Sequence, residues 1–311
     1  MQKIAIIGAG LAGIASARNL SQQGNQVTVF EKSRGFGGRC ATKRWMGCRV
    51  DHGAQYFTMR DAAFRQTVTE GCGDALRTIP APVHHLENGQ TSTTERFYHL
   101  QGNSHLCRDL ATGLDIRFEQ TVEAVLPAER GWQVQGELFN QVVSTAPLPQ
   151  TMRIFGQPAV PDSYIPCLAM VALYRGDHLG MTGEYYDITG RPADDLAWSA
   201  CENHKEGRII EGCTVMVAHA SEAFSREHLE QPPETWSEWL KGQLEALWEL
   251  PKNQFEAHVT HRWRYARVAE AVKIPSLPRG LHFCGDALEA SRVEAAWLQG
   301  ARLAQNFPPA P

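Results

Sequence analysis

Apolar and polar positions in the first 31 residues follow the pattern of a strand, a helix and a second strand. Residues 4–7 form an apolar run of the kind found in buried strands, and residues 11–23 carry alanine and leucine at helical spacing. Gly24 lies where this helix should end, and residues 27–30 form a second apolar run. The pattern predicts a β-α-β unit, which is the building block of a parallel sheet.

Downstream, the pattern predicts shorter elements and then a change of domain. Residues 61–76 and 104–111 are expected to be helical, an Asn88-Gly89 turn is typical of a hairpin, and residues 115–145 indicate strands of a small sheet. Five prolines between residues 147 and 166 interrupt any regular element there. We therefore expect a crossover between domains in this segment.

A second domain is predicted from two apolar runs, at residues 168–174 and 214–218, and from one amphipathic helix. That helix begins at Pro232-Pro233, and its large apolar residues fall on one side at helical spacing. These residues are Trp236, Trp239, Leu240, Leu244, Leu247 and Trp248. A stripe of this kind indicates a helix that faces the core of a second sheet.

Composition narrows the class of protein. The chain has 311 residues, of which 43% are hydrophobic and 21% charged, as in ordinary globular enzymes. Its formal net charge of −4 gives no global basic field for nucleic acid or a membrane surface. No apolar run reaches the roughly 18 residues that a bilayer requires, and the apolar stretch after Lys3 fits a first strand better than a secretory signal. We expect a cytoplasmic protein, with no protein partner evident.

The cysteines add one further constraint. All eight are scattered and none belongs to a C-x-x-C pair, which argues against a zinc site. We expect reduced thiols, the usual state in the cytoplasm, and no bound metal.

A glycine motif joins the predicted first strand to the first helix. Gly8 permits the tight turn, Gly10 lets the backbone approach a pyrophosphate, and Gly13 allows the helix to pack closely on the strand. The helix N-terminus adds free N–H groups and the positive end of its dipole. Glu31 lies at the end of the second strand, where its carboxylate can accept both ribose hydroxyls of an adenosine. This arrangement predicts a bound dinucleotide.

The segment after Glu31 distinguishes FAD from NAD. Residues 32–39 read Lys-Ser-Arg-Gly-Phe-Gly-Gly-Arg and resemble the second glycine motif of the FAD-dependent amine oxidase superfamily. The resemblance implies that Arg39 helps neutralise the pyrophosphate, which suits a guanidinium. Residues 281–286 read as a strand ending in Gly-Asp before a last helix. By the same resemblance, Asp286 binds the ribityl chain, and the positive end of that helix faces the flavin N1 and C2 carbonyl and stabilises the reduced flavin.

Three further segments make the resemblance more specific. Residues 51–57, 261–267 and 292–298 together resemble the bacterial renalase-like proteins, with dense matches at both ends of the chain and looser ones in the middle. The resemblance implies an α/β fold, in which a Rossmann-type, glutathione-reductase-like FAD-binding domain joins an α+β, amine-oxidase-like substrate domain. We expect residues 1–60, 100–150 and 255–311 in the FAD-binding domain, and residues 61–99 and 151–254 in the substrate domain.

The resemblance also implies an activity. Renalase-like proteins are associated with oxidising the 2- and 6-dihydro isomers of NAD(P)H to NAD(P)+, while O2 reoxidises the flavin and yields H2O2. Hydride transfer from a dihydropyridine requires no side chain to remove a proton, so we assign no catalytic side chain. No cysteine occupies the setting that tethers FAD covalently in some amine oxidases. We therefore expect noncovalent FAD, with a dihydro-NAD(P) isomer and O2 as substrates.

The candidate site residues come from these motifs. Those expected at FAD are Gly8, Gly10, Leu11, Ala12, Gly13, Glu31, Lys32, Ser33, Gly37, Gly38, Arg39, Gly53, Ala54, Gln55, Tyr56, Val122, Trp263, Gly285, Asp286, Val293, Glu294 and Ala295. Those expected at the substrate are Gln55, Tyr56, Trp198, His261, Trp263, Tyr265 and Arg267.

The last segment of the substrate set carries the preference for a dinucleotide. If residues 261–267 are extended, His261, Trp263, Tyr265 and Arg267 share one face. Three arginines within residues 262–267 make the neighbourhood positive, which favours a phosphate-bearing substrate over a protonated amine. The alternative is that these arginines pair with acidic residues such as Glu256 or Glu270 and only brace the domain interface.

Three positions depart from the family pattern. Ala295 stands where relatives usually have glycine, Val268 where they often have proline, and Ala287 where a bulky aromatic residue is expected. These departures leave pocket shape and substrate preference open, but not FAD binding. Two other functions also stay open: an amine oxidase acting on a small amine, and a flavin-binding protein with little turnover.

Overall fold

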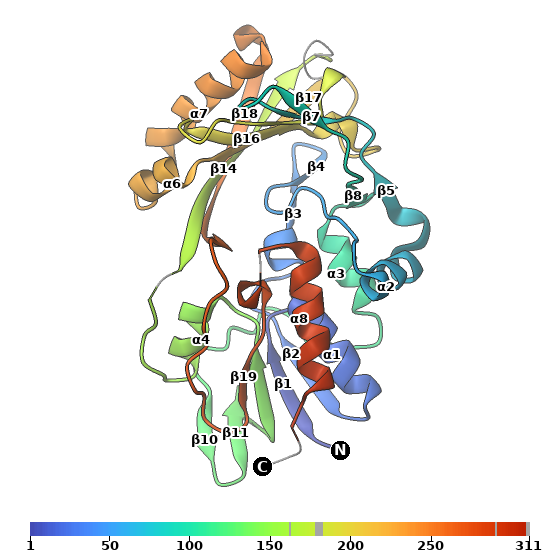
Figure 1. Ribbon diagram of the computed structural model, residues 1–311, viewed down its shortest axis with the longest axis vertical. Helices are drawn as coiled ribbons and strands as arrows, with labels where there is room; N and C mark the ends of the chain where they lie inside the picture. Colours follow the sequence, from blue (N-terminus) through green and yellow to red (C-terminus); the bar gives the residue numbers. More distant parts are fainter. Residues whose placement is uncertain (162, 178–182, 290, 309–311) are drawn as a thin grey trace.

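The computed structural model describes residues 1–161, 163–177, 183–289 and 291–308. Two large sheets lie toward opposite ends of its long axis (Figure 1). The first sheet is parallel throughout, in the order β19-β13-β1-β2-β9. Its strands are β1 (Lys3–Ile7), β2 (Gln26–Phe30), β9 (Asp115–Arg117), β13 (Gln141–Ser144) and β19 (Leu281–Phe283).

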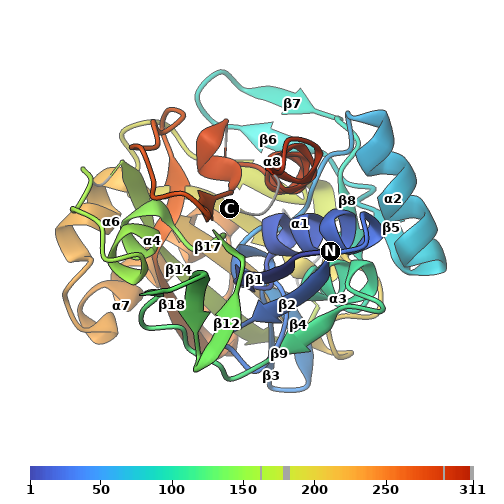
Figure 2. The same cartoon turned by 90° about the horizontal axis from the view of Figure 1, so that it is seen from below.

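Both faces of this sheet are covered. One face packs on α1 (Leu11–Gln22), α2 (Ala62–Cys72), α3 (Ser104–Leu110) and α8 (Val293–Gln305). The other face packs on α4 (Leu148–Ile154) and on a small antiparallel sheet of β10 (Leu126–Ala128), β11 (Gly131–Val134) and β12 (Glu137–Phe139). Figure 2 shows α1 and α8 together on one side of β1 and β2. This is a Rossmann-type domain, as the sequence predicted.

The alternation of side chains along each strand explains this two-sided burial. Ile4 and Ile6 of β1 belong to the core on the helical side, whereas Ala5 and Ile7 belong to the core beneath the small sheet. Successive side chains of a strand point to opposite faces. A strand that is apolar at every position, such as residues 4–7, therefore needs cover on both sides.

The second sheet has seven strands, in the order β18-β14-β17-β16-β15-β6-β7. They are β6 (Val83–His85), β7 (Gln90–Ser92), β14 (Tyr164–Arg175), β15 (Asp187–Thr189), β16 (Leu196–Cys201), β17 (Cys213–Ala220) and β18 (Phe255–Val268). Helices α6 (Glu222–His228) and α7 (Pro233–Trp248) lie over one face (Figure 1). The other face is directed toward the Rossmann-type domain (Figure 1).

Smaller elements link the two sheets. Strands β3 (Thr42–Trp45) and β4 (Cys48–Asp51) form a hairpin whose buried residues pack on the second sheet, and β5 (Leu76–Thr78) pairs with β8 (Phe97–His99). Short 3-10 helices occupy Gly38–Cys40, Gly73–Ala75, Glu202–His204, Lys252–Gln254 and Asp286–Leu288.

Several local predictions are confirmed. The Asp61 side chain accepts a hydrogen bond from the Phe64 backbone N–H at the start of α2. Gly89, at φ +68°, lies in the turn between β6 and β7. Pro233 opens α7, and Trp236 and Trp248 are buried beneath it. The expected stripe is wrong at one position, because Trp239 is 54% exposed. All eight cysteines are described and none is in a disulfide.

Two of the expected domain boundaries are wrong. Residues 255–268 form β18, the edge strand of the seven-stranded sheet, so the chain returns to the Rossmann-type domain only after Val268. Residues 62–72 form α2, and Phe64 and Val68 pack in the core shared by α1 and α8. In both cases the partner that buries the segment lies far away in the sequence, so no local break marks the boundary.

Among the described residues, none of the helices combines the length and the apolar composition needed to cross a membrane.

The crossing of α1 and α8 gives a test of this packing. A Cβ added at Gly300 would overlap the Ala12 carbonyl oxygen and lie 2.7 Å from the Ala15 Cβ. We expect Gly300→Ala to destabilise the fold by about 1–3 kcal/mol, because the helices must separate. Gly242→Ala is the control: a Cβ there meets no described atom within 4 Å, and alanine is the better helix former. Thermal unfolding should show a lower Tm for the first variant only; equal Tm values would contradict the close packing.

Candidate active site

The glycine motif forms a tight turn between β1 and α1. Gly8 has φ +106°, and an added Cβ would lie 2.7 Å from the Thr145 hydroxyl oxygen. A Cβ at Gly13 would overlap the Gly8 carbonyl oxygen, whereas one at Gly10 would meet no described atom within 4 Å. Gly8 and Gly13 are thus required by packing within the protein. Gly10 instead leaves room in front of the helix, where the first-turn N–H groups have no intrahelical acceptor.

Glu31 lies buried at the end of β2 and braces this turn. One carboxylate oxygen accepts the Ala9 backbone N–H at 2.8 Å, and the other accepts the Ser33 backbone N–H at 2.8 Å. Each oxygen keeps a further lone pair for a ligand hydroxyl. The Gln120 backbone N–H donates to the Glu31 carbonyl, which brings the segment containing Val122 alongside. Glu31 therefore keeps acceptor capacity at the place where the sequence predicts the ribose.

The second glycine motif folds back over the first. The Gly37 backbone N–H donates to the Ala9 carbonyl, and a Cβ at Gly38 would lie 3.8 Å from the Gly10 Cα. Gly37 has φ +118°, a conformation that disfavours any other residue. The two motifs thereby enclose the start of α1 with backbone rather than with bulky side chains.

Arg39 and Asp286 form a two-pronged ion pair. The guanidinium Nη1 lies 2.9 Å from Asp286 Oδ2, and Nη2 lies 2.5 Å from Oδ1. Arg39 Nη1 also donates to the Ala266 carbonyl, and the Ala54 backbone N–H donates to the Arg39 carbonyl. Sequence reasoning gave each residue a separate contact with FAD. In the structure they contact each other, and so they tie the second glycine motif to the Gly285-Asp286 motif.

The N-terminus of α8 completes this side of the site. α8 begins at Val293, with Ala295 buried in its first turn. The Glu294 carboxylate accepts the backbone N–H groups of Arg60 and Asp61, at 2.5 and 2.7 Å. Glu294 therefore connects the start of α8 to the start of α2. The sequence predicted a contact of Glu294 with FAD and did not indicate these hydrogen bonds.

Together these elements fit a dinucleotide with an adenosine end and a flavin end. The room at Gly10 and the donors at the start of α1 suit a pyrophosphate, and Glu31 suits a ribose diol. Asp286 and the start of α8 are the elements that the sequence assigns to the flavin end of the dinucleotide. Those are the residues that would hold FAD, with its adenosine near Glu31 and its isoalloxazine toward the seven-stranded sheet.

Behind this site lies a cluster of four buried charges that sequence reasoning missed. Lys205 Nζ lies 3.1 Å from Asp51 Oδ2 and 2.6 Å from Glu202 Oε1, and the Arg208 guanidinium contacts both acids. All four side chains are fully buried. Burial alone would raise the pKa of Asp51, but Arg208 and Lys205 lower it to about 2. The cluster joins β4 to the connection between β16 and β17.

This cluster supports the loop that carries Gln55 and Tyr56. Lys205 Nζ donates to Gln55 Oε1 at 3.5 Å, and the Asn103 side chain donates to the Ala54 and Gln55 carbonyls. Gln55 is buried, and the Arg96 guanidinium lies 5.2 Å from the centre of the Tyr56 ring. Gln55 is therefore held by its contact with the buried cluster, and Tyr56 by its contact with Arg96.

The inner face of the seven-stranded sheet carries a row of aromatic side chains. Trp198 of β16 is paired with His219 of β17, and Ala169 of β14 lies between His219 and His261 of β18. Residues in register on neighbouring strands project from the same face. Ring centres are 5.0 Å apart for Trp198 and His219, and 4.1 Å apart for His261 and Trp263. Trp198, His261 and Trp263, three of the predicted substrate-binding residues, thus lie on one wall.

His52 packs against this wall from the loop after β4. Its ring centre lies 4.7 Å from that of His261 and 5.3 Å from that of Trp263, whose indole N–H donates to the His52 carbonyl at 2.9 Å. Burial lowers the pKa of His52 to about 3 and that of His219 to about 4, and it also lowers the pKa of His261. The wall is therefore uncharged at neutral pH.

Tyr265 and Arg267 do not lie with His261 and Trp263. The register of β18 against β14 shifts between Ile165 and Cys167, so the strict alternation expected for residues 261–267 breaks there. Tyr265 packs edge-on against Tyr164, with ring centres 5.3 Å apart, in a separate apolar cluster. The Arg267 side chain is 55% exposed and pairs with Glu222.

The arginines of this segment do not make the site positive. The Arg264 guanidinium pairs with Glu230 at 2.6 Å, and Arg262 donates to the Gln231 carbonyl at 2.7 Å. Both contacts lie at the loop between α6 and α7, on the outer side of the sheet. The argument for a phosphate-binding neighbourhood from these arginines is therefore wrong, because the alternation directs Arg262 away from the inner face.

Asp187 was not predicted at all. It lies on β15 opposite Ala200 and is fully buried, and within the described chain neither of its carboxyl oxygens has a hydrogen-bond partner. Burial raises the pKa of Asp187 to about 7, although Arg96, Trp198 and Lys205 favour its charged form. No sequence motif marks this residue; only the pairing of β15 with β16 places it beside the aromatic wall.

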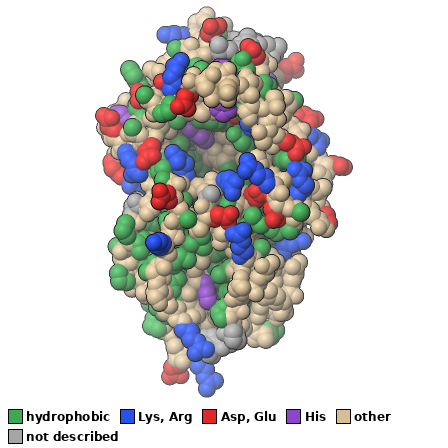
Figure 3. Space-filling view, viewed as in Figure 1, with side chains coloured by type: hydrophobic (Ala, Val, Ile, Leu, Met, Phe, Trp, Pro, Cys, Tyr) green, Lys and Arg blue, Asp and Glu red, His purple; other side chains and the backbone are tan. Residues whose placement is uncertain are grey.

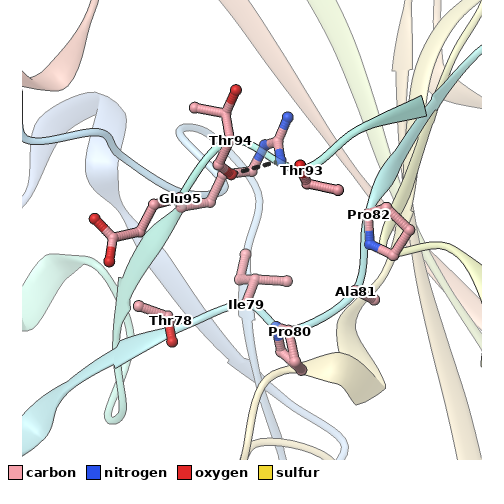
Figure 4. A pocket seen from close by; sticks show the side chains of 9 residues that line it. Thr78, Ile79, Pro80, Ala81, Pro82, Thr93, Thr94 and Glu95 are labelled. Atoms are coloured by element: carbon pink, nitrogen blue, oxygen red, sulfur yellow. Dashed lines mark hydrogen bonds between the residues drawn. The ribbon is translucent and has the colours of Figure 1, made fainter. Parts of the chain in front are cut away.

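The surface between the domains is hollowed, with histidine side chains at its wall (Figure 3). A separate pocket of about 240 Å³ lies between residues 78–82 and 93–96 (Figure 4). Its lining includes Arg96 but none of the predicted site residues. Ile79 lines that pocket and packs with Tyr56 and Tyr186. The pocket thus adjoins the end of the aromatic wall near Tyr56 and Tyr186, and it is distinct from the glycine-rich cradle.

Comparison with known proteins agrees with this architecture. Residues 6–70 match the model of the NAD(P)-binding Rossmann-like domain. The chain is also similar to the 4,4'-diapophytoene desaturase of Staphylococcus aureus strain Newman, with 39% identity over 71 residues. That match covers 23% of this chain and 14% of the desaturase.

Solved structures match over nearly the whole chain at low identity. A putative protoporphyrinogen oxidase from Exiguobacterium sp. 255-15 superimposes with a TM-score of 0.77 and 11% identity, over 98% of both chains. A putrescine oxidase variant gives 0.71 and 14%, also over 98% of both chains. Reduced UDP-galactopyranose mutase gives 0.76 and 10%, over 98% of this chain and 95% of the mutase. The chain has the two-domain fold of these enzymes.

The role of Glu31 can be tested directly. We expect Glu31→Gln to weaken FAD binding by about 1.5–3 kcal/mol, because a charge-assisted hydrogen bond to the ribose is lost. Glu70→Gln, at an exposed position of α2, is the control. Flavin content after purification and FAD titration of the stripped protein measure the effect. Equal flavin affinity in both variants would show that Glu31 does not bind the ribose.

The burial of Asp187 predicts a pH-dependent stability. Because its pKa rises from 3.8 to about 7 on folding, the native protein keeps a proton that the unfolded chain releases. This contribution to stability is present below about pH 4 and is lost as the pH rises toward 7, at about 1.4 kcal/mol per pKa unit. The difference in Tm between Asp187→Asn and the wild type should therefore favour the variant more at pH 8 than at pH 5. A difference independent of pH would show that Asp187 is not protonated in the native state.

Proposed function

We propose that this protein is an FAD-dependent oxidase that takes a hydride from the 2- or 6-dihydro isomers of NAD(P). The cradle around Gly10 and Glu31 supports FAD as the cofactor. The observation that carries the choice of substrate is the uncharged aromatic wall of His261, Trp263 and His52 on the inner face of the seven-stranded sheet. A planar dihydropyridine ring suits such a wall.

When bound, FAD would supply the hydride acceptor, and its reoxidation by O2 would yield H2O2. The wall residues would hold the dihydropyridine parallel to the acceptor and exclude water from it. No residue has to remove a proton, because the ring-nitrogen lone pair of the substrate drives the loss of hydride. This requirement agrees with a site whose three histidines are held neutral by burial.

Electrostatics at the wall also favour a neutral or anionic substrate. Lys43 acts on both His52 and His261 and helps to keep them uncharged. A protonated amine entering beside His52 and His261 would meet the positive charge of Lys43, whereas the carboxyl group of Asp187 lies at the β15 end of the wall. The substrate class rests on this local charge pattern, and not on the arginines of β18.

The second candidate is an amine oxidase. The similarity in fold to putrescine oxidase and one feature of this chain, the buried carboxyl group of Asp187, favour it. An ionised Asp187 could hold an ammonium group at the outer end of the wall. The two functions differ in which substrate reduces the flavin.

Anaerobic stopped-flow spectroscopy of the flavin band distinguishes them. We expect 2- or 6-dihydro-NAD(P) to bleach the flavin far faster than putrescine or benzylamine. Trp263→Phe should slow this step by roughly tenfold or more, equivalent to about 1.4 kcal/mol, because the variant loses the bond to the His52 carbonyl and part of the wall. Trp239→Phe, on the exposed side of α7, should leave the rate unchanged.

Two results would count against the proposal. Bleaching by an amine at least as fast as by the dihydronicotinamides would favour the amine oxidase. Absence of bleaching by every substrate, in protein that carries a full complement of flavin, would favour a flavin-binding protein with little turnover.

A further inference from the structure

Asp187 belongs to the same sheet face as the aromatic wall. It lies opposite Ala200, two residues from Trp198 along β16, and Thr189 of β15 lies opposite Trp198 itself. Since alternate residues of a strand share a face, Asp187 and Trp198 project from the inner face. The row therefore begins with a carboxyl group on β15 and continues through Trp198 and His219 to His261 and Trp263 on β18.

The surroundings of Asp187 do not satisfy it. Its two oxygens are buried, and neither makes a hydrogen bond of normal geometry among the described residues, although the Trp198 side chain lies near enough to favour the charged form. The Arg96 guanidinium, which acts on it electrostatically, is instead held by the Thr94 carbonyl at 2.9 Å and the Ser92 hydroxyl at 3.2 Å. A buried polar group without a partner is costly, because it loses its hydrogen bonds to water. Such a group needs an explanation, and binding of a ligand is one.

We propose that Asp187 is a specificity-determining residue that binds a carboxamide group of the substrate through its protonated carboxyl. This inference rests on the proposed function. It names the group on the substrate that the β15 end of the wall recognises. A protonated carboxyl offers one O–H donor and one C=O acceptor in a single plane. A primary carboxamide offers the complementary acceptor and donor, so the two groups form a pair of hydrogen bonds. The nicotinamide ring of the proposed substrate carries such a carboxamide.

The neighbours of Asp187 suit a planar group held edge-on to it. Tyr186 precedes it in the chain, with its ring centre 6.1 Å from that of Tyr56 and 6.4 Å from that of Trp198. These rings supply apolar surface and keep the carboxyl group dry. The charged groups that face it are Arg96 and Lys205, and Lys205 is already neutralised by Asp51 and Glu202. The proton on Asp187 is therefore retained near neutral pH by burial.

Binding of NAD+, the product of the proposed reaction, tests the inference through perturbation of the flavin spectrum of the holoenzyme. Because only the protonated form binds and its pKa is about 7, the Kd of the wild type should rise about tenfold from pH 6 to pH 8. Asp187→Asn keeps a donor and an acceptor, so its Kd should stay within about twofold over this range. Asp187→Leu should bind at least tenfold more weakly at pH 6.

Asp74→Asn, at an exposed position far from the wall, is the matched control and should behave as the wild type. Flavin content and Tm are measured for every variant, so that loss of binding is not confused with loss of fold. If Asp187→Leu fails to fold, the contrast in pH dependence between Asp187→Asn and the wild type alone decides the inference.

The outcomes separate this inference from the proposed function. If dihydro-NAD(P) reduces the wild-type flavin and NAD+ binds to the wild type and Asp187→Leu equally, the inference is overturned while the proposed function stands. If an amine is the better reductant and Asp187→Asn loses it, then Asp187 is an ionised anchor for a cation, and both are overturned. A tenfold pH effect that disappears in Asp187→Asn supports the inference.

Discussion

The buried pairing of Asp51, Glu202, Lys205 and Arg208 fixes how the two domains meet. Asp51 belongs to the segment that follows the second glycine motif, whereas the other three belong to the connection between β16 and β17 of the seven-stranded sheet. Removing any one charge would leave its partners buried and uncompensated, which typically costs 3–5 kcal/mol. The cluster therefore tolerates one arrangement of the two segments. The Gln55-Tyr56 loop contacts the cluster through Gln55, so the cluster also fixes the position of this loop.

A second constraint acts in the Rossmann-type domain, where glycines let backbone segments approach each other without intervening side chains. Gly8, Gly13 and Gly53 each lie where a Cβ would meet a carbonyl or hydroxyl oxygen, so the turns after β1 and β4 can approach their neighbours closely. The Arg39–Asp286 pair then connects these turns to the last strand. The rigid cradle and the rigid loop together define a gap between the domains. Under the proposed function, the FAD and the planar substrate would both lie in this gap.

The sequence predicted those parts of the fold whose cause is local. The β-α-β unit, the cap at Asp61 and the turn at Gly89 all depend on residues that lie near each other in the sequence. The errors concern partners far away in the chain. Nothing near residues 255–268 reveals that they pair with β14, and nothing near Arg262 or Arg264 reveals that they point toward the α6–α7 loop. Asp187 and the four-charge cluster were missed for the same reason, because only the folded chain brings their distant segments together.

The distribution of charge between the two faces of the seven-stranded sheet has a chemical consequence. Arginines 262 and 264 are neutralised on the outer side, and the four-charge cluster is neutralised within itself. The inner face is left with imidazoles that burial keeps neutral and with one carboxyl that burial keeps protonated near pH 7. A hydride donor that becomes a cation as it reacts would gain little from a fixed anion before the reaction, and a fixed anion would hold the product. Under the proposed function, a neutral wall would bind the substrate by shape and by hydrogen bonds, and it would not retain the cationic product.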